Sequence, residues 1–128
     1  MQEIKELIVL WIKRINDTEN IPENIVAFNF GIFESENEHM IYLSGSIVFD
    51  AEDDDWACDE DYNPKEKYLG LTALSKNIDW EEIQNFVKES IEMFANSFSN
   101  TFLHKAEYVS TGFDAGELIQ ISIHKTEV

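Results

Sequence analysis

Residues 79–98 carry the pattern that most constrains how this chain can fold. Apolar residues recur there at steps of three and four, which places them on one face of a helix, opposite a polar face. Asp79 is a suitable N-cap, and it has the spacing of a capping box with Glu82. Ile78 and Ile83 have the spacing of a hydrophobic staple. A helix with such a stripe must bury it against a second layer of structure. The stripe consists of Trp80, Ile83, Val87, Ile91, Phe94 and Phe98.

The rest of the chain divides into one more helix and several short strands. Residues 2–16 repeat apolar side chains with helical spacing, and Asn16 to Pro22 contain the residues that end a helix. Other segments alternate apolar and polar residues between turn signals, which is typical of strands with one wet face. The expected strands are residues 25–33, 40–49, 67–73, 108–113 and 117–123, with the last two joined by a turn at 114–116.

This order, α-β-β-β-α-β-β, predicts an α+β two-layer sandwich. Consecutive hairpins favour an antiparallel sheet of about five strands, and the two amphipathic helices can cover one of its faces. The strand–helix alternation that builds a doubly wound parallel sheet is missing. A chain of 128 residues suits one domain, so we expect residues 1–128 to share a single core.

The charge of the chain excludes several classes of partner. Twenty-six Asp and Glu face nine Lys and Arg, which gives a formal net charge of −17. Nucleic acids and anionic membranes are therefore not expected as partners, because both are bound through clustered basic residues. A protein with a basic surface would instead be attracted, and its encounter with the chain accelerated.

About half of this charge lies in one segment. Residues 50–61 hold eight acids and no base, whereas the other 116 residues carry a net charge of −9. The segment fits a solvated loop that aids solubility, a partner-binding loop, or a weak divalent-cation site that lacks the EF-hand pattern. Trp56 within it either folds back to hold the loop on the core or provides an apolar contact for a partner.

Signals for catalysis and cofactors are weak. His39, His104 and His124 have no His or Cys at metal-ligand spacing, and phosphate-loop, dinucleotide and nucleophile-elbow motifs are missing. We therefore expect no catalytic residues, no metal and no cofactor. A single cysteine, Cys58, and an N-terminus unlike a signal peptide predict a cytoplasmic protein.

Three segments together resemble a known group of proteins. They are Ile-Tyr-Leu-Ser-Gly-Ser at 41–46, Asp-Asp-Asp-Trp-Ala-Cys at 53–58, and Asp-Trp-Glu-Glu at 79–82. The combination is similar to the small acidic bacterial immunity proteins of polymorphic-toxin systems. The resemblance implies a non-enzymatic protein that binds and blocks a cognate toxin domain, whose surface would be basic if it is a nuclease.

On this hypothesis the acids of the loop attract and pair with basic groups, and two aromatic residues provide a buried contact. Two other functions stay open. One is a generic interaction or adaptor domain that uses the exposed side of the first hairpin with Tyr42, Ser44 and Ser46, and a free sheet face would also allow a homodimer. The other is a small enzyme dependent on carboxylates or a divalent metal. The predicted partner-binding residues are Asp53, Asp54, Asp55, Trp56, Glu60, Asp61 and Tyr62.

Overall fold

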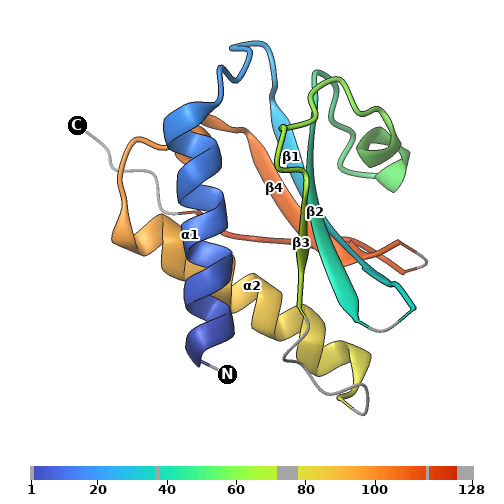
Figure 1. Cartoon of the computed structure of the whole chain (residues 1–128). Helices are drawn as coiled ribbons and strands as arrows, with labels where there is room; N and C mark the ends of the chain where they lie inside the picture. The colour runs from blue at the N-terminus through green and yellow to red at the C-terminus, as the bar shows by residue number, and fades with distance from the viewer. Residues whose placement is uncertain (1, 37, 72–77, 115, 124–128) are drawn as a thin grey trace.

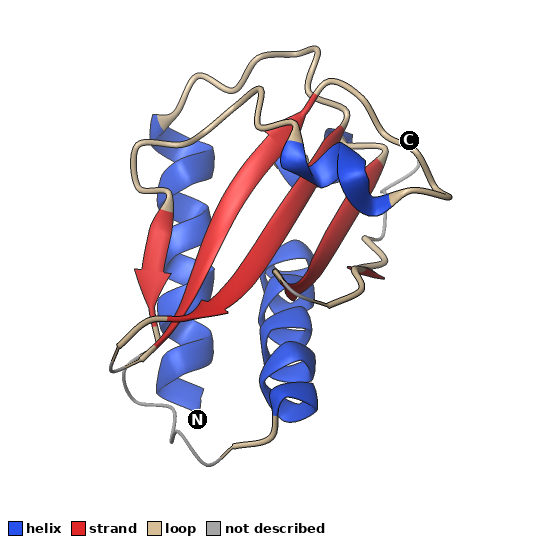
Figure 2. Cartoon of the chain, turned by 90° about the vertical axis from the view of Figure 1, so that its right-hand side faces the viewer, coloured by secondary structure: helices blue, strands red, loops and turns tan. Residues whose placement is uncertain are grey.

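The computed structural model describes residues 2–36, 38–71, 78–114 and 116–123. Two long helices, α1 (Gln2–Thr18) and α2 (Trp80–Ser97), cover one face of a sheet, and the predicted α+β class is confirmed (Figure 1). The opposite face carries a loop with a short 3₁₀ helix, η1 (Asp54–Cys58) (Figure 2). The strands of the described chain are β1 (Ala27–Glu34), β2 (His39–Ser46), β3 (Tyr68–Gly70), β4 (Tyr108–Phe113) and β5 (Ile119–Gln120), and a third helix, α3 (Phe102–Lys105), precedes β4.

The element boundaries follow the sequence pattern closely for the helices and less closely for the strands. Asp79 is the N-cap of α2, and its side chain accepts a hydrogen bond from the Glu81 N–H at 3.4 Å. The second expected strand, 40–49, is too long, because β2 ends at Ser46 and Ile47 is exposed. The expected strands 67–73 and 117–123 shorten to β3 and β5, and residues 72 and 73 lie outside the described residues.

The sheet is mixed, which corrects the expectation of an antiparallel one. Its strand order is β3-β2-β1-β4-β5, and β1 pairs in parallel with β4, with Phe28 opposite Val109 and Phe30 opposite Thr111. The three other pairings are antiparallel. The connection from β3 to β4 contains α2 and α3, so it is long enough to return the chain to the end of the sheet where β1 begins. β4 can then pair with β1 instead of extending the sheet beyond β3.

The core lies between the sheet and the two long helices. Trp11 of α1 packs edge to face on Phe30 of β1, with ring centroids 6.1 Å apart, and Phe28 packs similarly on Phe102 at 4.9 Å. Most of the buried apolar side chains belong to one contiguous cluster, which extends from Ile4 to Ile121 and does not include Trp56. Burial of this surface is the dominant favourable contribution to folding. None of the described helices has the length and apolarity needed to cross a membrane.

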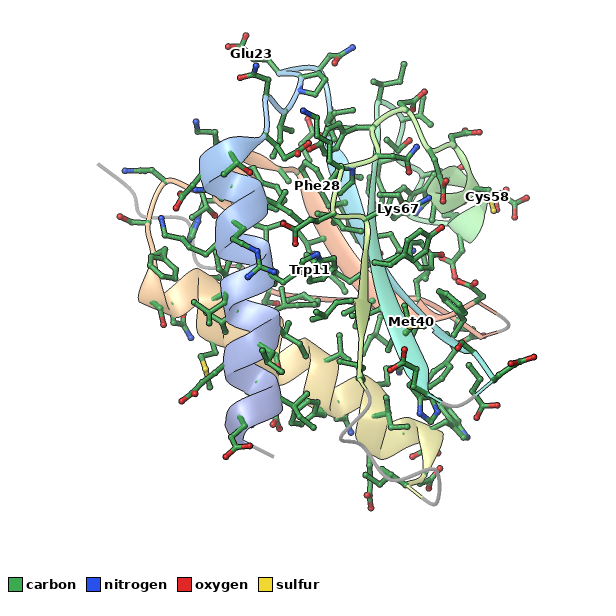
Figure 3. All side chains as sticks on the ribbon, viewed as in Figure 1. Trp11, Glu23, Phe28, Met40, Cys58 and Lys67 are labelled. Atoms are coloured by element: carbon green, nitrogen blue, oxygen red, sulfur yellow. The ribbon has the colours of Figure 1, made fainter. Side chains whose placement is uncertain are left out.

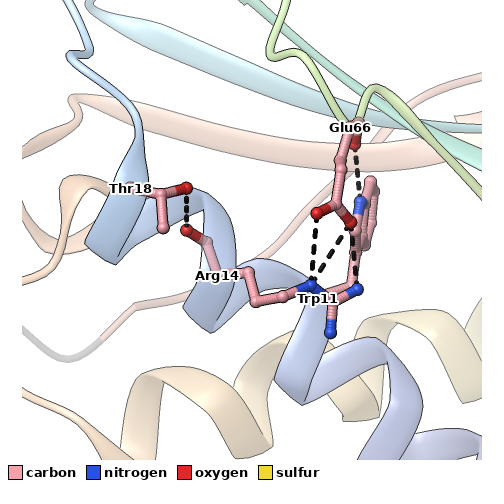
Figure 4. Close-up of polar contacts among 4 residues, drawn as sticks. All are labelled: Trp11, Arg14, Thr18 and Glu66. Atoms are coloured by element: carbon pink, nitrogen blue, oxygen red, sulfur yellow. Dashed lines mark hydrogen bonds and ion pairs between the residues drawn. The ribbon is translucent and has the colours of Figure 1, made fainter.

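Helix α1 also holds the segment that follows the acidic loop. The Trp11 indole N–H donates to the Glu66 carbonyl at 2.7 Å, and the Arg14 guanidinium pairs with the Glu66 carboxylate at 3.0 Å (Figure 4). A buried indole N–H needs such an acceptor, because leaving it unpaired would cost free energy. The end of the loop is therefore attached to the helical layer, although the loop itself lies on the other face of the sheet.

Candidate functional site

The acidic segment 50–61 lies on the face of the sheet that the two long helices leave uncovered (Figure 2). Its only aromatic side chain, Trp56, is 5% exposed. The Trp56 ring packs edge to face on Phe49 at 5.5 Å and on Tyr108 of β4 at 5.7 Å. The rings of Phe49 and Tyr108 stack on each other at 4.1 Å. These three rings hold η1 against the sheet. Trp56 thus folds back onto its own chain, which is one of the two alternatives that the sequence left open, and it presents little surface to a partner in this conformation.

Three acids of the predicted site accept hydrogen bonds from nearby N–H groups. Asp53 is the N-cap of η1, and its Oδ1 accepts from the Asp55 N–H at 2.9 Å. Asp54 Oδ2 accepts from the Leu118 N–H at 3.2 Å, which connects the loop to the chain just before β5. Asp61 Oδ2 accepts from the backbone N–H of Ile47 at 2.9 Å. Hydrogen bonds to charged acceptors are stronger than neutral ones and offset part of the repulsion between the acids.

Tyr62 and Glu60 occupy different environments. Tyr62 is buried beside Gly45 of β2, and its hydroxyl donates to Glu19 Oε1 at 3.0 Å, so it presents little surface to a partner in this conformation. Burial, followed by this hydrogen bond, raises the pKa of Tyr62. Glu60 is exposed but pairs with Lys67 at 2.8 Å. The structure therefore leaves the five predicted carboxylates at the surface and removes both predicted aromatic residues from it.

A hollow of about 480 Å³ lies between the acidic loop and the uncovered face of the sheet. Asn29 of β1 and Gly112 of β4 line it from the sheet. Asn29 is buried, and its Oδ1 accepts from the Ser110 hydroxyl at 2.9 Å. Cys58 is exposed and lines the hollow, and Figure 3 labels it near η1 (Figure 3). Four carboxylates line the same hollow, those of Asp54, Asp55, Glu60 and Asp114.

Sequence reasoning missed the pair Tyr42 and Asp114, which completes this hollow. The Tyr42 hydroxyl donates to Asp114 Oδ1 at 2.7 Å, and its ring lies across Gly31, where a β-carbon would overlap it. Burial first, and then the Asp114 carboxylate, raises the pKa of Tyr42. The pairing of Gly31 with Tyr42 depends on the β1–β2 register, and the Asp114 contact depends on β4 lying beside β1. The two residues are 72 positions apart, and no local pattern connects them.

The polar side of the first hairpin is not the open surface that the adaptor hypothesis expected. Ser44 and Ser46 are buried and Tyr42 is half-buried. The reason is that the segment after β2 folds back over these strands: Tyr62 bridges Gly45, and Asp61 lies 3.4 Å from the Ser46 hydroxyl. An interaction through Ser44 and Ser46 would require this segment to leave the sheet.

The chemistry available at this site is that of a carboxylate surface. Exposed carboxylates arranged around a hollow can pair with cations. Because the loop is held on the sheet, these side chains need little reordering when a cation binds. Within the described part of the chain, no group of three or more His, Cys, Asp or Glu side chains is arranged to hold a metal ion. Burial, and then the nearby charge of Asp54, raises the pKa of Tyr108, so the phenol under the loop stays neutral at physiological pH.

Comparisons with protein-family models, with curated proteins and with solved structures found no match to this chain.

Proposed function

We propose that this chain is a non-enzymatic, immunity-like protein of the cytoplasm that binds and neutralises a basic toxin domain through its acidic face. The observation that carries the proposal is the placement of the segment 50–61. Its aromatic ring packs on Phe49 and Tyr108, and its carboxylates accept from the backbone N–H groups of Ile47 and Leu118 outside the segment. The side chains of Asp53, Asp54 and Asp55 stay at the surface. A loop that served only solubility would gain nothing from such fixation.

The distribution of charge supports a basic partner. Carboxylates from the loop, from η1 and from the end of β4 line one hollow, and the chain as a whole carries a formal charge of −17. Fields of this kind accelerate the encounter with an oppositely charged protein and repel acidic ones. A nuclease-type toxin has a basic surface because it binds phosphates, and an acidic protein can occupy that surface in place of the nucleic acid.

Charge neutralisation with a matched control tests the proposal. The first variant carries Asp53→Asn, Asp54→Asn and Asp55→Asn. Asparagine can still cap η1, so the loop should keep its conformation. The control carries Glu3→Gln, Glu6→Gln and Glu23→Gln, which removes the same charge from exposed positions, and Figure 3 shows Glu23 well separated from η1 (Figure 3).

The measurement is the association rate with the protein encoded beside this gene, at low and at high salt. We expect the aspartate variant to associate about tenfold more slowly at low salt and to lose most of its salt dependence, whereas the control changes much less. Equal rates for the two triple variants would show that only the net charge matters, and an unchanged rate in the aspartate variant would remove the acidic loop from the binding surface.

A further inference from the structure

A second hollow, of about 760 Å³, lies beside the acidic one. The two share Phe113, Asp114 and Gly116, so one partner can cover both. The second hollow is lined by residues from the end of β1, the first two turns of α2, the end of β4 and the segment 116–119. Its lining differs from that of the acidic hollow because aromatic rings contribute much of it, those of Phe33, Trp80 and Phe113.

Trp80 is the unusual member of this group. It is the first residue of α2 and is 56% exposed, whereas Trp11 is fully buried and Trp56 nearly so. Its ring stands edge to face with Phe113, at 6.3 Å and an interplanar angle of 89°. An accessible indole supported from one side by a second ring is a typical contact residue of protein interfaces, where tryptophan is enriched.

Carboxylates surround these rings. Glu34 at the end of β1 and Glu117 before β5 are exposed, and both line the hollow together with Asp114. The positive end of the α2 dipole would disfavour a cation here, but Asp79 caps it and Glu81 and Glu82 lie in the first turn. The ionisable side chains named around the hollow are therefore all acidic.

We propose that this aromatic and acidic hollow binds an arginine side chain of the basic partner, an inference that rests on the proposed function. Cations are attracted to the faces of aromatic rings, most strongly to tryptophan. Arginine suits this hollow better than lysine, because its planar guanidinium can stack on an indole while it donates two hydrogen bonds to a carboxylate. Its aliphatic stem would also cover the apolar part of the lining.

The same chemistry already operates elsewhere in this protein. The Lys67 ammonium lies 5.5 Å from the ring centroid of Tyr42 and 5.4 Å from that of Tyr68, and it pairs with Glu60 at 2.8 Å. Two rings and one carboxylate thus hold an internal cation. The hollow at Trp80 has the same elements, two rings in edge-to-face contact and nearby carboxylates, with an accessible indole that an external cation can reach.

Titration with a short arginine peptide tests the inference, because the three tryptophans report separately. The probe is acetyl-Gly-Arg-Gly-Arg-Gly-amide, and its control replaces each arginine with citrulline, which has nearly the same shape and no charge. The readout is the indole N–H resonance of each tryptophan in two-dimensional NMR. We expect the arginine peptide to shift the Trp80 resonance and to leave that of Trp11 unchanged, since the Trp11 N–H is bonded to Glu66 inside the core.

Variants then separate the contributions. Trp80→Ala should weaken binding of the peptide about fivefold, and Trp80→Phe, which keeps an aromatic ring, should weaken it less. The double variant Glu34→Gln and Glu117→Gln should also weaken binding, although it leaves all the aromatic rings in place. Since Trp80 is exposed, these variants should fold, which far-UV circular dichroism checks. Equal binding of the citrulline peptide, or unchanged affinity in Trp80→Ala, overturns the inference.

The two proposals can fail separately. If the arginine peptide shifts only residues 53–61 and the triple aspartate variant loses this response, the acidic face binds cations and the arginine hollow is refuted. If Trp80 responds but the triple aspartate variant associates with the basic partner as fast as the wild type, the hollow is confirmed and the role of the acidic loop is refuted.

Discussion

The substitution Trp56→Ala measures how firmly the acidic loop is held on the sheet. A buried tryptophan removes roughly 150–250 Å² from water, which corresponds to about 4–6 kcal/mol at roughly 25 cal/mol/Å². Truncations of buried Phe and Trp cost about 3–5 kcal/mol in measured cores. The loop can relax around the lost ring, so we expect the lower end, a decrease of about 3 kcal/mol in the free energy of unfolding.

Trp80→Ala is the matched control, because it is the same chemical change at an exposed site. It loses one edge-to-face ring pair, with Phe113, and should cost about 1 kcal/mol or less. The assay is urea denaturation followed by far-UV circular dichroism, which is less affected by the loss of an indole than fluorescence is. If Trp56→Ala costs no more than Trp80→Ala, the three-ring contact of Trp56 with Phe49 and Tyr108 does not hold the loop.

Two further predictions concern the pair Tyr42 and Asp114. Gly31→Ala places a methyl group where the Tyr42 ring lies, so it should lower the free energy of unfolding by about 2 kcal/mol. Urea denaturation measures this loss, and the near-UV circular dichroism of tyrosine should change as well. An unchanged free energy of unfolding would contradict the close approach of the ring to Gly31. The pKa of Tyr42 is higher in the folded state than in the unfolded chain, because the fold favours the neutral phenol. The resulting stabilisation is fully present below about pH 10, where the unfolded phenol is also neutral, and it is lost as the pH rises toward the folded-state pKa. Tyr42→Phe should therefore show a shallower loss of stability in alkaline solution than the wild type, and parallel curves would contradict this assignment.

The helices and the general class of the fold could be predicted because their signals are local. The residues of α2 that face the core are three or four positions apart, and Asp79 caps the helix through a group two residues away. The parallel pairing of β1 with β4 could not be predicted in this way. Strand order depends on where a long connection returns the chain, and residues 72–77, which lie in that connection, carry no pattern that decides it.

The sequence predicts the candidate site from its charge but not its geometry. The run of acids at 50–61 indicated where the charge is concentrated, because charge density is a property of the sequence. Whether Trp56 and Tyr62 would point outward depended on what they could pack against. Phe49 and Tyr108 provide one such surface and Gly45 the other, and the sheet brings these residues within reach only after it has formed.

The sequence by itself determined that the chain is acidic, that it forms two amphipathic helices and several short strands, and that half of its charge lies in one segment. Composition and side-chain periodicity are enough for each of these conclusions. The tertiary structure decided which side chains meet across the sheet. It turned Trp56 inward, joined Tyr42 to Asp114, and placed Trp80 beside Phe113 in a second hollow. Such contacts join residues far apart in the chain, so they are set by strand register and packing, which no local pattern encodes.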